Sequence, residues 1–518
     1  MNKKPLRLDK LLLSTEDSAA IDREAQEKWG FNGFALVEAA GRLCAQRFTQ
    51  AFPAFFDRDS APNVVVAAGT GNNAADALVM LRHWILSGLV HSASSTVLVS
   101  RLSVADTDSP RAQLLKSLTM MNVPVVLWNK GIPMGHLFAQ ADIILDGIAG
   151  TGLKGALEGS ALEMAAAVNT HEKPFVVSVD IPSGSSDQWK PGMPIINADL
   201  TLAIEPQKLC LYTPAARPYA GNIITVGAVF PREIAAGYAG AELADWESAQ
   251  KTVSKIRPDA YKHKRGTVEI RAGSPGATGA ALIAARGAQA AGAGLVRLVV
   301  DDDIYPILAS QAAGIMVFPA AKSAADGNAD AILLGPGWGK TENRLPVLER
   351  ALEREKTGTP LILDADAIEL AREKVFGGNT ILTPHPGELS AFSGITKEEL
   401  LCRPAPLLRE LACQQKAVII FKGHVITVAA PDGRLAVLDG MTPVLAAGGS
   451  GDLLAGFCAA IAARMVREGV FCAYTCAGAA AALLVETGNP KRFKPRFTDP
   501  MELAARAAEL AAQAWLPV

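Results

Sequence analysis

Short runs of β-branched and aliphatic residues alternate with alanine-rich stretches along most of this chain. Strands that are separated by helices form parallel sheets with helices on both faces. Ligands of such sheets bind beyond the carboxyl ends of the strands. The alternation therefore predicts an α/β fold whose functional residues follow its strands. In the first half we expect strands at residues 64–66, 96–99, 123–127, 143–145 and 175–179, and a helix at residues 76–86.

The alternation stops between residues 231 and 265, where Tyr, Gly, Ala and charged residues replace the strand pattern, and then it restarts. A chain of 518 residues also exceeds what one hydrophobic core supports. We therefore expect two domains, at residues 1–235 and 259–518, joined by a linker at residues 236–258. In the second half we expect strands at residues 268–270, 296–300, 331–334, 361–363, 381–382 and 418–421, a helix at residues 277–291, and helices from residue 452 onward.

Charge and cysteine content favour a protein of the cytoplasm that binds small molecules. The formal net charge of -2 gives no electrostatic footprint for nucleic acid or an anionic membrane. The seven cysteines are scattered without a Cys-x-x-Cys pair, which indicates reduced thiols. The apolar runs are well below the roughly 18 residues of a spanning helix, and Leu11-Leu12-Leu13 is too short for a signal-peptide core.

The run Gly448-Gly449-Ser450-Gly451-Asp452 precedes an apolar, alanine-rich stretch at residues 453–465. Small residues at the start of a helix let backbone N–H groups point at an anion, and the helix dipole favours negative charge there. Asp452 would lie beside a bound phosphate, where it could take the proton from a hydroxyl that attacks the terminal phosphoryl group. The alternative is that the glycines and Asp452 only cap the helix.

Other loops of the second half follow expected strands. Glycine-rich loops lie at residues 273–280 and 335–339, and His385 lies between two prolines that restrict its loop. Asp364 and Asp366 could hold magnesium directly or through water, or Asp366 could be an N-cap. Lys422 could steady a nucleotide phosphate, or it could be a solvated charge at the end of a strand.

In the first half, residues 68–74 satisfy the dinucleotide fingerprint G-x-G-x-x-G/A, which by itself suggests an oxidoreductase with Arg101 near a 2′-phosphate. Asp146 and the segment at residues 179–184 favour different chemistry. Their carboxylate and hydroxyl oxygens, together with an amide, are hard ligands for a monovalent or divalent cation, and a carboxylate there can act as an acid or base. Each segment could also be ordinary turn chemistry.

Taken in order, the segments of residues 255–515 resemble the ADP- or ATP-dependent NAD(P)H-hydrate dehydratases, whose fold is a ribokinase-like α/β/α sandwich. The resemblance implies that Asp452 is catalytic and that Asp452 and His385 meet the hydrated nicotinamide ring, with Ala280 and Gly337 lining its pocket. It also implies magnesium and an adenine nucleotide. The residues implied around the nucleotide are Lys422, Gly423, His424, Val425, Ile426 and Gly451.

With Leu36-Val37-Glu38-Ala39-Ala40-Gly41 ahead of them, the motifs of residues 8–230 resemble the NAD(P)H-hydrate epimerases, and we expect a Rossmann-like α/β/α sandwich. The resemblance implies that Asn73, Asp146 and Ser183 bind potassium and that Asp180 meets the hydrate and transfers a proton. The residues implied to line the pocket are Asn72, Asn73, Ala74, Ala75, Asp76, Gly150, Thr151, Gly152, Leu153, Lys154, Gly155 and Ala156. The family has glycines where this chain has Ala74, Ala75 and Ala77, so added methyl groups could crowd the ligand.

Over nearly its whole length the chain thus resembles a fusion of the two enzymes. It would interconvert the R and S hydrates of NADH and NADPH and dehydrate the S form, releasing AMP or ADP and phosphate. We also expect a homo-oligomer that binds neither nucleic acid nor membrane. The alternatives are a ribokinase-like kinase of a vitamin precursor joined to a non-catalytic ligand-sensing domain, and the oxidoreductase suggested by the fingerprint.

Overall fold

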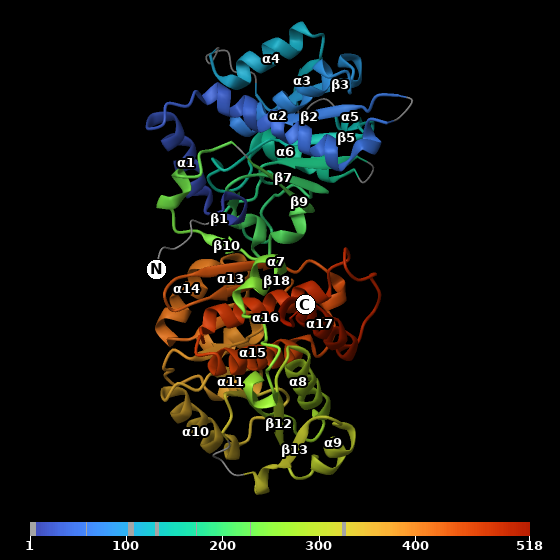
Figure 1. Ribbon diagram of the computed structural model, residues 1–518. Helices are drawn as coiled ribbons and strands as arrows, with labels where there is room; N and C mark the ends of the chain where they lie inside the picture. Colours follow the sequence, from blue (N-terminus) through green and yellow to red (C-terminus); the bar gives the residue numbers. More distant parts are fainter. Residues whose placement is uncertain are drawn as a thin grey trace. The chain divides into compact units, whose positions relative to one another are not determined.

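The computed structural model describes residues 7–57, 60–101, 108–129, 134–171, 174–227, 229–323 and 328–517. The chain divides into two compact units, which we call unit 1 (Met1–Glu242) and unit 2 (Leu243–Val518). Each unit has a central sheet with its own hydrophobic core (Figure 1). The prediction of two α/β domains is confirmed.

Among the described residues of unit 1, parallel strands form a sheet in the order β4-β3-β2-β5-β6-β7-β9. Their bounds are β2 Val64–Ala68, β3 Ser95–Val99, β4 Val125–Leu127, β5 Ile143–Gly147, β6 Phe175–Val179, β7 Leu200–Ile204 and β9 Asn222–Val226. β7 and β9 were not predicted, because their runs are flanked by long loops rather than helices. A second small group pairs β1 (Leu11–Leu13) with β8 (Gln207–Lys208) and β10 (Ala241–Leu243).

Helices cover both faces of this sheet, because alternate strand residues point to opposite sides. Val64 and Val66 pack with helices α2, α3 and α4, while Val65 and Ala67 pack with α5 and α6. The bounds are α1 Thr15–Glu27, α2 Gly33–Ala51, α3 Asn72–Leu86, α4 Pro110–Met120, α5 Gly135–Ala139 and α6 Gly159–Asn169. Helix α3 begins four residues before the predicted start at residue 76, so Asn72, Asn73 and Asp76 all lie in its first turns.

In unit 2 the described strands lie in the order β13-β12-β11-β14-β15-β16-β17-β18-β19. They are parallel up to β17, and β18 and β19 are antiparallel. The bounds are β11 Thr267–Arg271, β12 Leu295–Val300, β13 Met316–Pro319, β14 Ala331–Leu334, β15 Leu361–Leu363, β16 Thr380–Leu382, β17 Val418–Phe421, β18 Val425–Ala429 and β19 Leu435–Asp439. The predicted strands are found, whereas β13, β18 and β19 were not predicted.

Helices α7, α8, α15, α16 and α17 share one core with the sheet of unit 2. Helices α8 and α15 approach closely, since a Cβ on Gly456 would lie 2.2 Å from the carbonyl oxygen of Ala284. Helices α10 and α14 contact β15, β17 and β18. The bounds are α7 Trp246–Ala249, α8 Thr278–Ala290, α9 Tyr305–Gln311, α10 Leu345–Lys356, α11 Asp366–Leu370, α12 Pro386–Ser393, α13 Lys397–Cys402, α14 Pro404–Gln415, α15 Ser450–Arg467, α16 Ala473–Thr487 and α17 Pro500–Trp515.

The segment expected as a linker, residues 236–258, contains β10 and α7. Trp246, Ala249 and Val253 are buried in the core of unit 2, and the rings of Trp246 and Trp515 lie 5.7 Å apart. Apolar side chains within a stretch rich in polar and small residues thus bring part of this segment into unit 2. The domain boundaries themselves stay a prediction.

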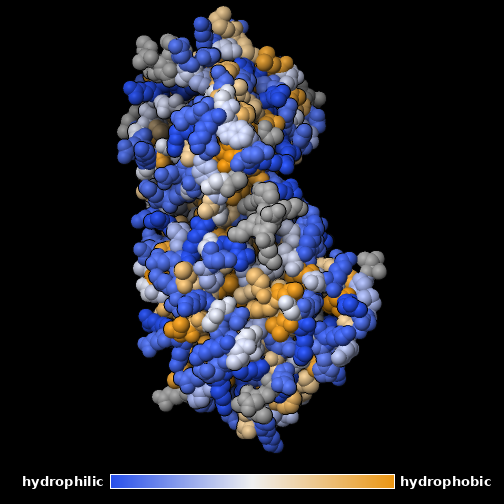
Figure 2. Space-filling model, turned by 60° about the vertical axis from the view of Figure 1, so that its left-hand side comes forward, coloured by the Kyte–Doolittle hydropathy of each residue, from blue (hydrophilic) through white to orange (hydrophobic). Residues whose placement is uncertain are grey.

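The surface and the thiols agree with the composition. The face in Figure 2 is covered mainly by hydrophilic residues, with small hydrophobic groups between them. All seven cysteines carry free thiols. In the part of the chain that the structure describes, no helix combines the length and the apolar character that crossing a bilayer requires.

Candidate active sites of the two units

A cavity of about 550 Å³ lies in unit 1, beyond the carboxyl ends of β2, β5 and β6. It is the position that a parallel sheet favours for a ligand. Residues predicted for the substrate pocket that line it are Asn72, Asn73, Asp76, Gly150, Thr151, Gly152, Leu153, Lys154 and Asp180. The sequence analysis missed other lining residues, among them Asp22 and Arg23 on α1, Lys208 on β8, and Phe230.

Four predicted pocket residues, Ala74, Ala75, Gly155 and Ala156, are not among the residues that line this cavity. Ala74 and Ala75 are fully buried in helix α3 and belong to the core on that face of the sheet. A helix turns by about 100° per residue, so its third and fourth residues face away from the second and fifth. The methyl groups that distinguish this chain therefore fill the core instead of crowding the cavity.

The predicted potassium ligands Asn73, Asp146 and Ser183 lie together beside Ala149, and of the three only Asn73 is among the residues that line the cavity. The Asp146 carboxylate is fully buried and accepts hydrogen bonds from the Ser183 hydroxyl at 2.5 Å and the Ser178 hydroxyl at 2.7 Å. Asn73 Nδ2 donates a hydrogen bond to the carbonyl oxygen of Ala149 at 3.0 Å, and Ser183 Oγ lies 3.0 Å from the same oxygen. Burial raises the pKa of Asp146, while its hydrogen bonds to Ser183 and Ser178 lower it.

Asp180 follows β6 and has φ of 65°, the left-handed region that non-glycine residues rarely adopt. Its Oδ1 accepts hydrogen bonds from Lys208 Nζ at 2.5 Å and from the backbone N–H of Ile204 at 3.2 Å. The Lys208 side chain is only 4% exposed and the Asp180 side chain 13%. Backbone strain of this kind is concentrated at functional sites, and here it presents a carboxylate to the cavity.

Asp76 is a second buried carboxylate of the cavity, and burial raises its pKa well above the usual value. The negative charge of Asp180 raises that pKa further, whereas Lys208 lowers it.

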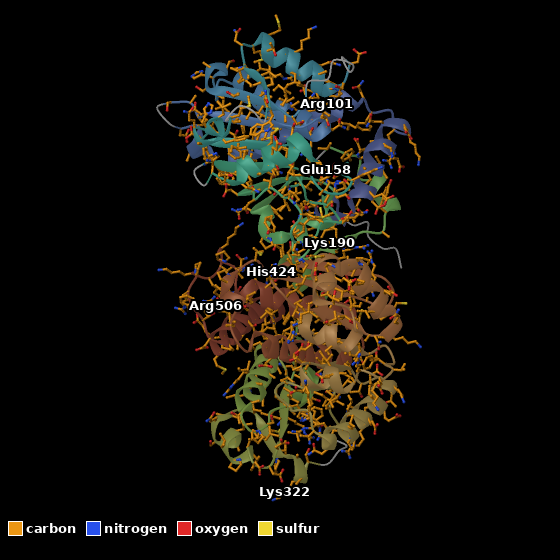
Figure 3. The ribbon with its side chains drawn as sticks, turned by 180° about the vertical axis from the view of Figure 1, so that it is seen from behind. Arg101, Glu158, Lys190, Lys322, His424 and Arg506 are labelled. Carbon is orange, nitrogen blue, oxygen red and sulfur yellow. The ribbon has the colours of Figure 1, made fainter. Side chains whose placement is uncertain are left out.

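Close packing explains one glycine of the dinucleotide fingerprint, and Arg101 lies outside the cavity. A Cβ on Gly69 would lie 1.8 Å from the carbonyl oxygen of Ile148, so close packing of two loops requires a glycine there. Arg101, labelled in Figure 3, is exposed at the end of β3 and is not among the residues that line the cavity.

In unit 2, Asp452 lies in the first turn of α15, after Gly449 as the N-cap residue with φ of 95°. A Cβ on Gly451 would lie 3.2 Å from Lys422 Nζ, which places that ammonium group beside the helix start. Exposed N–H groups, a helix dipole and a lysine are together suited to a phosphate.

The charged groups around Asp452 converge from the ends of several strands. Lys422 Nζ lies 2.7 Å from Asp364 and 3.8 Å from Glu388, and Asp364 also accepts a hydrogen bond from the Thr383 hydroxyl at 2.6 Å. Lys422 is thus a paired charge, not a solvated one. Burial and the negative charge of Asp364 raise the pKa of Asp452 to about 7, despite the opposite effect of Lys422.

His385 is the N-cap residue of α12, and its imidazole belongs to a capping box with Glu388. Its Nδ1 accepts hydrogen bonds from the backbone N–H groups of Gly387 at 2.9 Å and Glu388 at 3.3 Å. Helix α12 therefore begins directly after His385, and the imidazole caps it. The side chain is still 56% exposed, so its Nε2 edge can contact a ligand.

The remaining predicted residues of unit 2 fall into two groups. A Cβ on Gly337 would lie 2.9 Å from the Cβ of Ala280, so these two expected pocket residues are neighbours. Gly423 and His424 form the exposed turn between β17 and β18, where Figure 3 labels His424, while Val425 and Ile426 are buried in β18.

Asp366 is not the N-cap of α11, which is Ala365, and its carboxylate accepts a hydrogen bond from the N–H of Gly339.

Comparisons with known proteins cover both units. A family model described as NAD(P)H-hydrate dehydratase matches residues 268–495, and one described as YjeF-related protein N-terminus matches residues 33–210. The bifunctional NAD(P)H-hydrate repair enzyme Nnr of Salinibacter ruber is 30% identical over 531 residues, covering 94% of each chain. The chain belongs to the family of bifunctional NAD(P)H-hydrate repair enzymes.

Other members of this repair-enzyme family are similar over most of their length. The Escherichia coli enzyme is 27% identical over 476 residues, which cover 89% of this chain and 87% of its own. A solved ADP/ATP-dependent NAD(P)H-hydrate dehydratase from Bacillus subtilis, co-crystallised with ATP and Mg²⁺, is 24% identical with a TM-score of 0.47, and covers 52% of this chain and 98% of its own. A kinase joined to a non-catalytic domain is not favoured, because repair-enzyme relatives match both halves.

Proposed function

We propose that the two activities of this repair enzyme are divided between its units. Unit 1 interconverts the R and S epimers of NADH or NADPH hydrate, and unit 2 dehydrates the S epimer with ADP or ATP. The observation that supports this division is that the two family models match separate parts of the chain, one within each unit. Because only one epimer is dehydrated, an epimerase on the same chain returns the whole damaged pool to NADH or NADPH.

In unit 2, Asp452 takes the proton from the hydroxyl of the hydrate while the hydroxyl oxygen attacks the terminal phosphoryl group. This step yields AMP or ADP and a phosphorylated hydrate. The electron pair of the ring nitrogen then expels phosphate, and loss of a proton from the adjacent carbon restores NADH or NADPH. A pKa of about 7 suits Asp452 to this role, because a base is most effective when its pKa lies near the working pH.

The adenine nucleotide lies against the turn after β17 and the start of α15. Its phosphates meet Lys422 and the N–H groups near Gly451, and Gly423, His424, Val425 and Ile426 contact the rest of the nucleotide. Ala280, Gly337 and the Nε2 edge of His385 surround the nicotinamide ring.

Magnesium would be held mainly by the nucleotide phosphates, with Asp364 or Asp366 contributing directly or through water. Among the described residues, no three His, Cys, Asp or Glu side chains are grouped so that they could hold a metal ion. A magnesium ion that binds mainly through nucleotide phosphates needs only one or two carboxylates from the protein. When bound, magnesium would neutralise phosphate charge.

In unit 1, Asp180 takes the proton from the hydroxyl of the hydrate while the bond between that carbon and the ring nitrogen breaks. The electron pair of the broken bond goes to the nitrogen and is delocalised toward the carboxamide, and the carbon becomes an aldehyde. The aldehyde turns, the nitrogen attacks its other face, and Asp180 returns the proton to the oxygen. No atom is gained or lost in these steps, which invert the configuration of the carbon and return the enzyme to its starting state.

Potassium fits the group formed by Asn73, Asp146 and Ser183. Asn73 Oδ1 is buried and lacks a hydrogen-bond partner, although its own Nδ2 is satisfied by Ala149. An unpaired buried carbonyl oxygen costs free energy that a bound cation would offset. Amide, carboxylate and hydroxyl oxygens are also the hard ligands that such a cation takes. We further expect a homo-oligomer of the cytoplasm, as the sequence suggested.

The decisive experiment supplies a mixture of R and S hydrates with ADP or ATP and follows recovery of reduced-nicotinamide absorbance. Product analysis should find free phosphate and NADH or NADPH without a stable phosphorylated acceptor. A stable phosphorylated product would instead support a small-molecule kinase. Parallel reactions with the two nucleotides and the two hydrates determine the preferences of each unit.

A further inference from the structure

We assign proton transfer in unit 1 to the Asp180 carboxylate. Among the described residues, Lys208 is the one lysine that forms an ion pair with it. Its Nζ donates to Asp180 Oδ1 at 2.5 Å and to the carbonyl oxygen of Ile204 at 3.0 Å. Both Lys208 and Asp180 line the cavity. The lysine stem is enclosed by protein, so its ammonium group has a fixed position.

The polypeptide path explains this position. Lys208 follows β7 by four residues and lies in the short strand β8, which pairs with β1 outside the main sheet. The N–H of Asp180 donates to the carbonyl oxygen of Leu202, also on β7, at 2.9 Å. One segment therefore fixes both the backbone of Asp180 and the cation that contacts its side chain.

Both side-chain hydrogen bonds that the structure gives Asp180 end on Oδ1. A carboxylate held by two donors on one oxygen has its orientation fixed, and its Oδ2 remains to accept a proton. The left-handed backbone at Asp180 adds to this constraint, because it directs the side chain where an extended strand residue would not.

Other ionisable groups face this pair from several elements. They are Asp22 on α1, Cys44 on α2, Asp76 on α3, and Cys210 just after β8. Burial raises the pKa of Asp22, Cys44, Asp76 and Cys210, and Lys208 lowers each of these values. Arg23 and Lys154 also line the cavity but are exposed. Lys208 is thus the buried cation that offsets the acidic groups of the cavity.

We propose that Lys208 is a positioning residue of the epimerase site, which holds Asp180 as a carboxylate with Oδ2 toward the hydrate. This inference rests on the proposed function of unit 1. When the proton moves to Asp180, negative charge moves to the ring nitrogen and the conjugated carboxamide. The ammonium group contacts Asp180 and lines the cavity, so it can balance the negative charge before and after transfer with little reorganisation.

The test measures epimerisation of hydrate against pH in the full-length chain for wild type, Lys208→Met, Lys208→Gln and Lys208→Arg. We expect Lys208→Met to lower kcat about 100-fold, which is the scale of one acid–base or electrostatic contribution. We expect the acid limb of the profile to move to higher pH, because a carboxylate without its cation binds protons more tightly. Lys208→Arg should restore most of that pH shift.

Three controls distinguish positioning from folding. Dehydration of purified S hydrate by the same variants reports unit 2 and should be unchanged. Lys190→Met removes an exposed lysine of unit 1, labelled in Figure 3, that is outside the cavity lining, and it should leave both kcat and the pH profile unchanged. If Lys208→Met does not fold, Lys208→Gln removes the charge but keeps a donor and gives the same pH test.

An acid limb that stays in place in both neutral variants would overturn the role of Lys208. A rise in KM alone, with kcat and the pH profile unchanged, would also overturn it, because Lys208 would then be only a substrate-binding group. Asp180→Asn separates this failure from that of the proposed function: full epimerisation by that variant would refute Asp180 as the proton acceptor, whatever Lys208 does.

Discussion

In unit 1 the lysine contacts the aspartate assigned to proton transfer, whereas in unit 2 it contacts a neighbour of that aspartate. Lys208 Nζ lies 2.5 Å from Asp180. Lys422 Nζ instead lies 2.7 Å from Asp364, and Asp452 is surrounded by the negative charges of Asp364 and Glu388. The pKa of Asp452 consequently rises to about 7.

This difference teaches that the partner of the lysine determines which carboxylate its charge contacts directly. In the mechanism proposed for unit 2, Asp452 accepts a proton as a phosphoryl group is transferred, and a pKa near neutrality favours that role. In the mechanism proposed for unit 1, Asp180 accepts a proton and then returns it, and Lys208 holds its side chain in place throughout. The predictions below test whether the two arrangements have these separate effects.

The largest effect should come from Asp452→Asn, because an amide cannot accept the hydroxyl proton. We expect dehydration to fall by about 10²- to 10⁴-fold, the usual contribution of a positioned general base. Recovery of reduced-nicotinamide absorbance with ADP or ATP measures it. Epimerisation, followed by chromatography of the two hydrates, serves as the control and should be unchanged; dehydration at the wild-type rate would remove Asp452 from the mechanism.

Asp180→Asn should affect only one of two kinetic phases. With a mixture of epimers, the S hydrate should disappear in a fast phase at the wild-type rate, because unit 2 is intact. The R hydrate should then be consumed only as fast as it epimerises spontaneously. The amplitude of the fast phase therefore equals the S fraction of the mixture, and a single fast phase in this variant would contradict the division of labour between the units.

The regular alternation of strands and helices could be predicted from the sequence. Strands such as β14 and β17 have the predicted bounds, because buried parallel strands are continuous apolar runs. The apolar runs also show where each strand ends. The carboxylates at these strand ends or at helix starts are Asp146, Asp180, Asp364 and Asp452. The positions of such residues depend on their neighbours in the chain, so they can be predicted from the sequence.

Contacts between distant segments could not be predicted in this way. Lys208 lies in a two-residue strand without a motif, and it meets Asp180 because β7, which precedes it, pairs in parallel with β6. His385 was expected to face a ligand, but the N–H groups of its own helix occupy its Nδ1. Periodicity could have indicated that Ala74 and Ala75 face the core, had the helix start been placed at Asn72.

Asp364→Asn should shift the pH profile of dehydration. Asp364 raises the pKa of Asp452, and Lys422 lowers it. Without the Asp364 charge, the repulsion is lost and Lys422 is released to act on Asp452, so both changes lower its pKa below about 7. A base works when deprotonated, so kcat/KM for S hydrate should persist to lower pH than in wild type.

The matched variant is Glu388→Gln, which should shift the profile in the same direction but by less, because Glu388 raises the pKa of Asp452 less than Asp364 does. A shift to higher pH in either variant would mean that Asp452 is not the group that limits the acid side of the profile.

Ala75→Gly should have the smallest effect on catalysis, although it restores a glycine at a position where the family has one. Ala75 is fully buried in α3 and is not among the residues that line the cavity, so kcat/KM for epimerisation should be unchanged. Glycine within a helix costs about 1 kcal/mol relative to alanine, which should lower the unfolding midpoint of unit 1 by about 2–4 °C in calorimetry. If epimerisation instead became faster, the methyl group would limit access to the cavity, and the comparison of the units would need a steric term in addition to the electrostatic one.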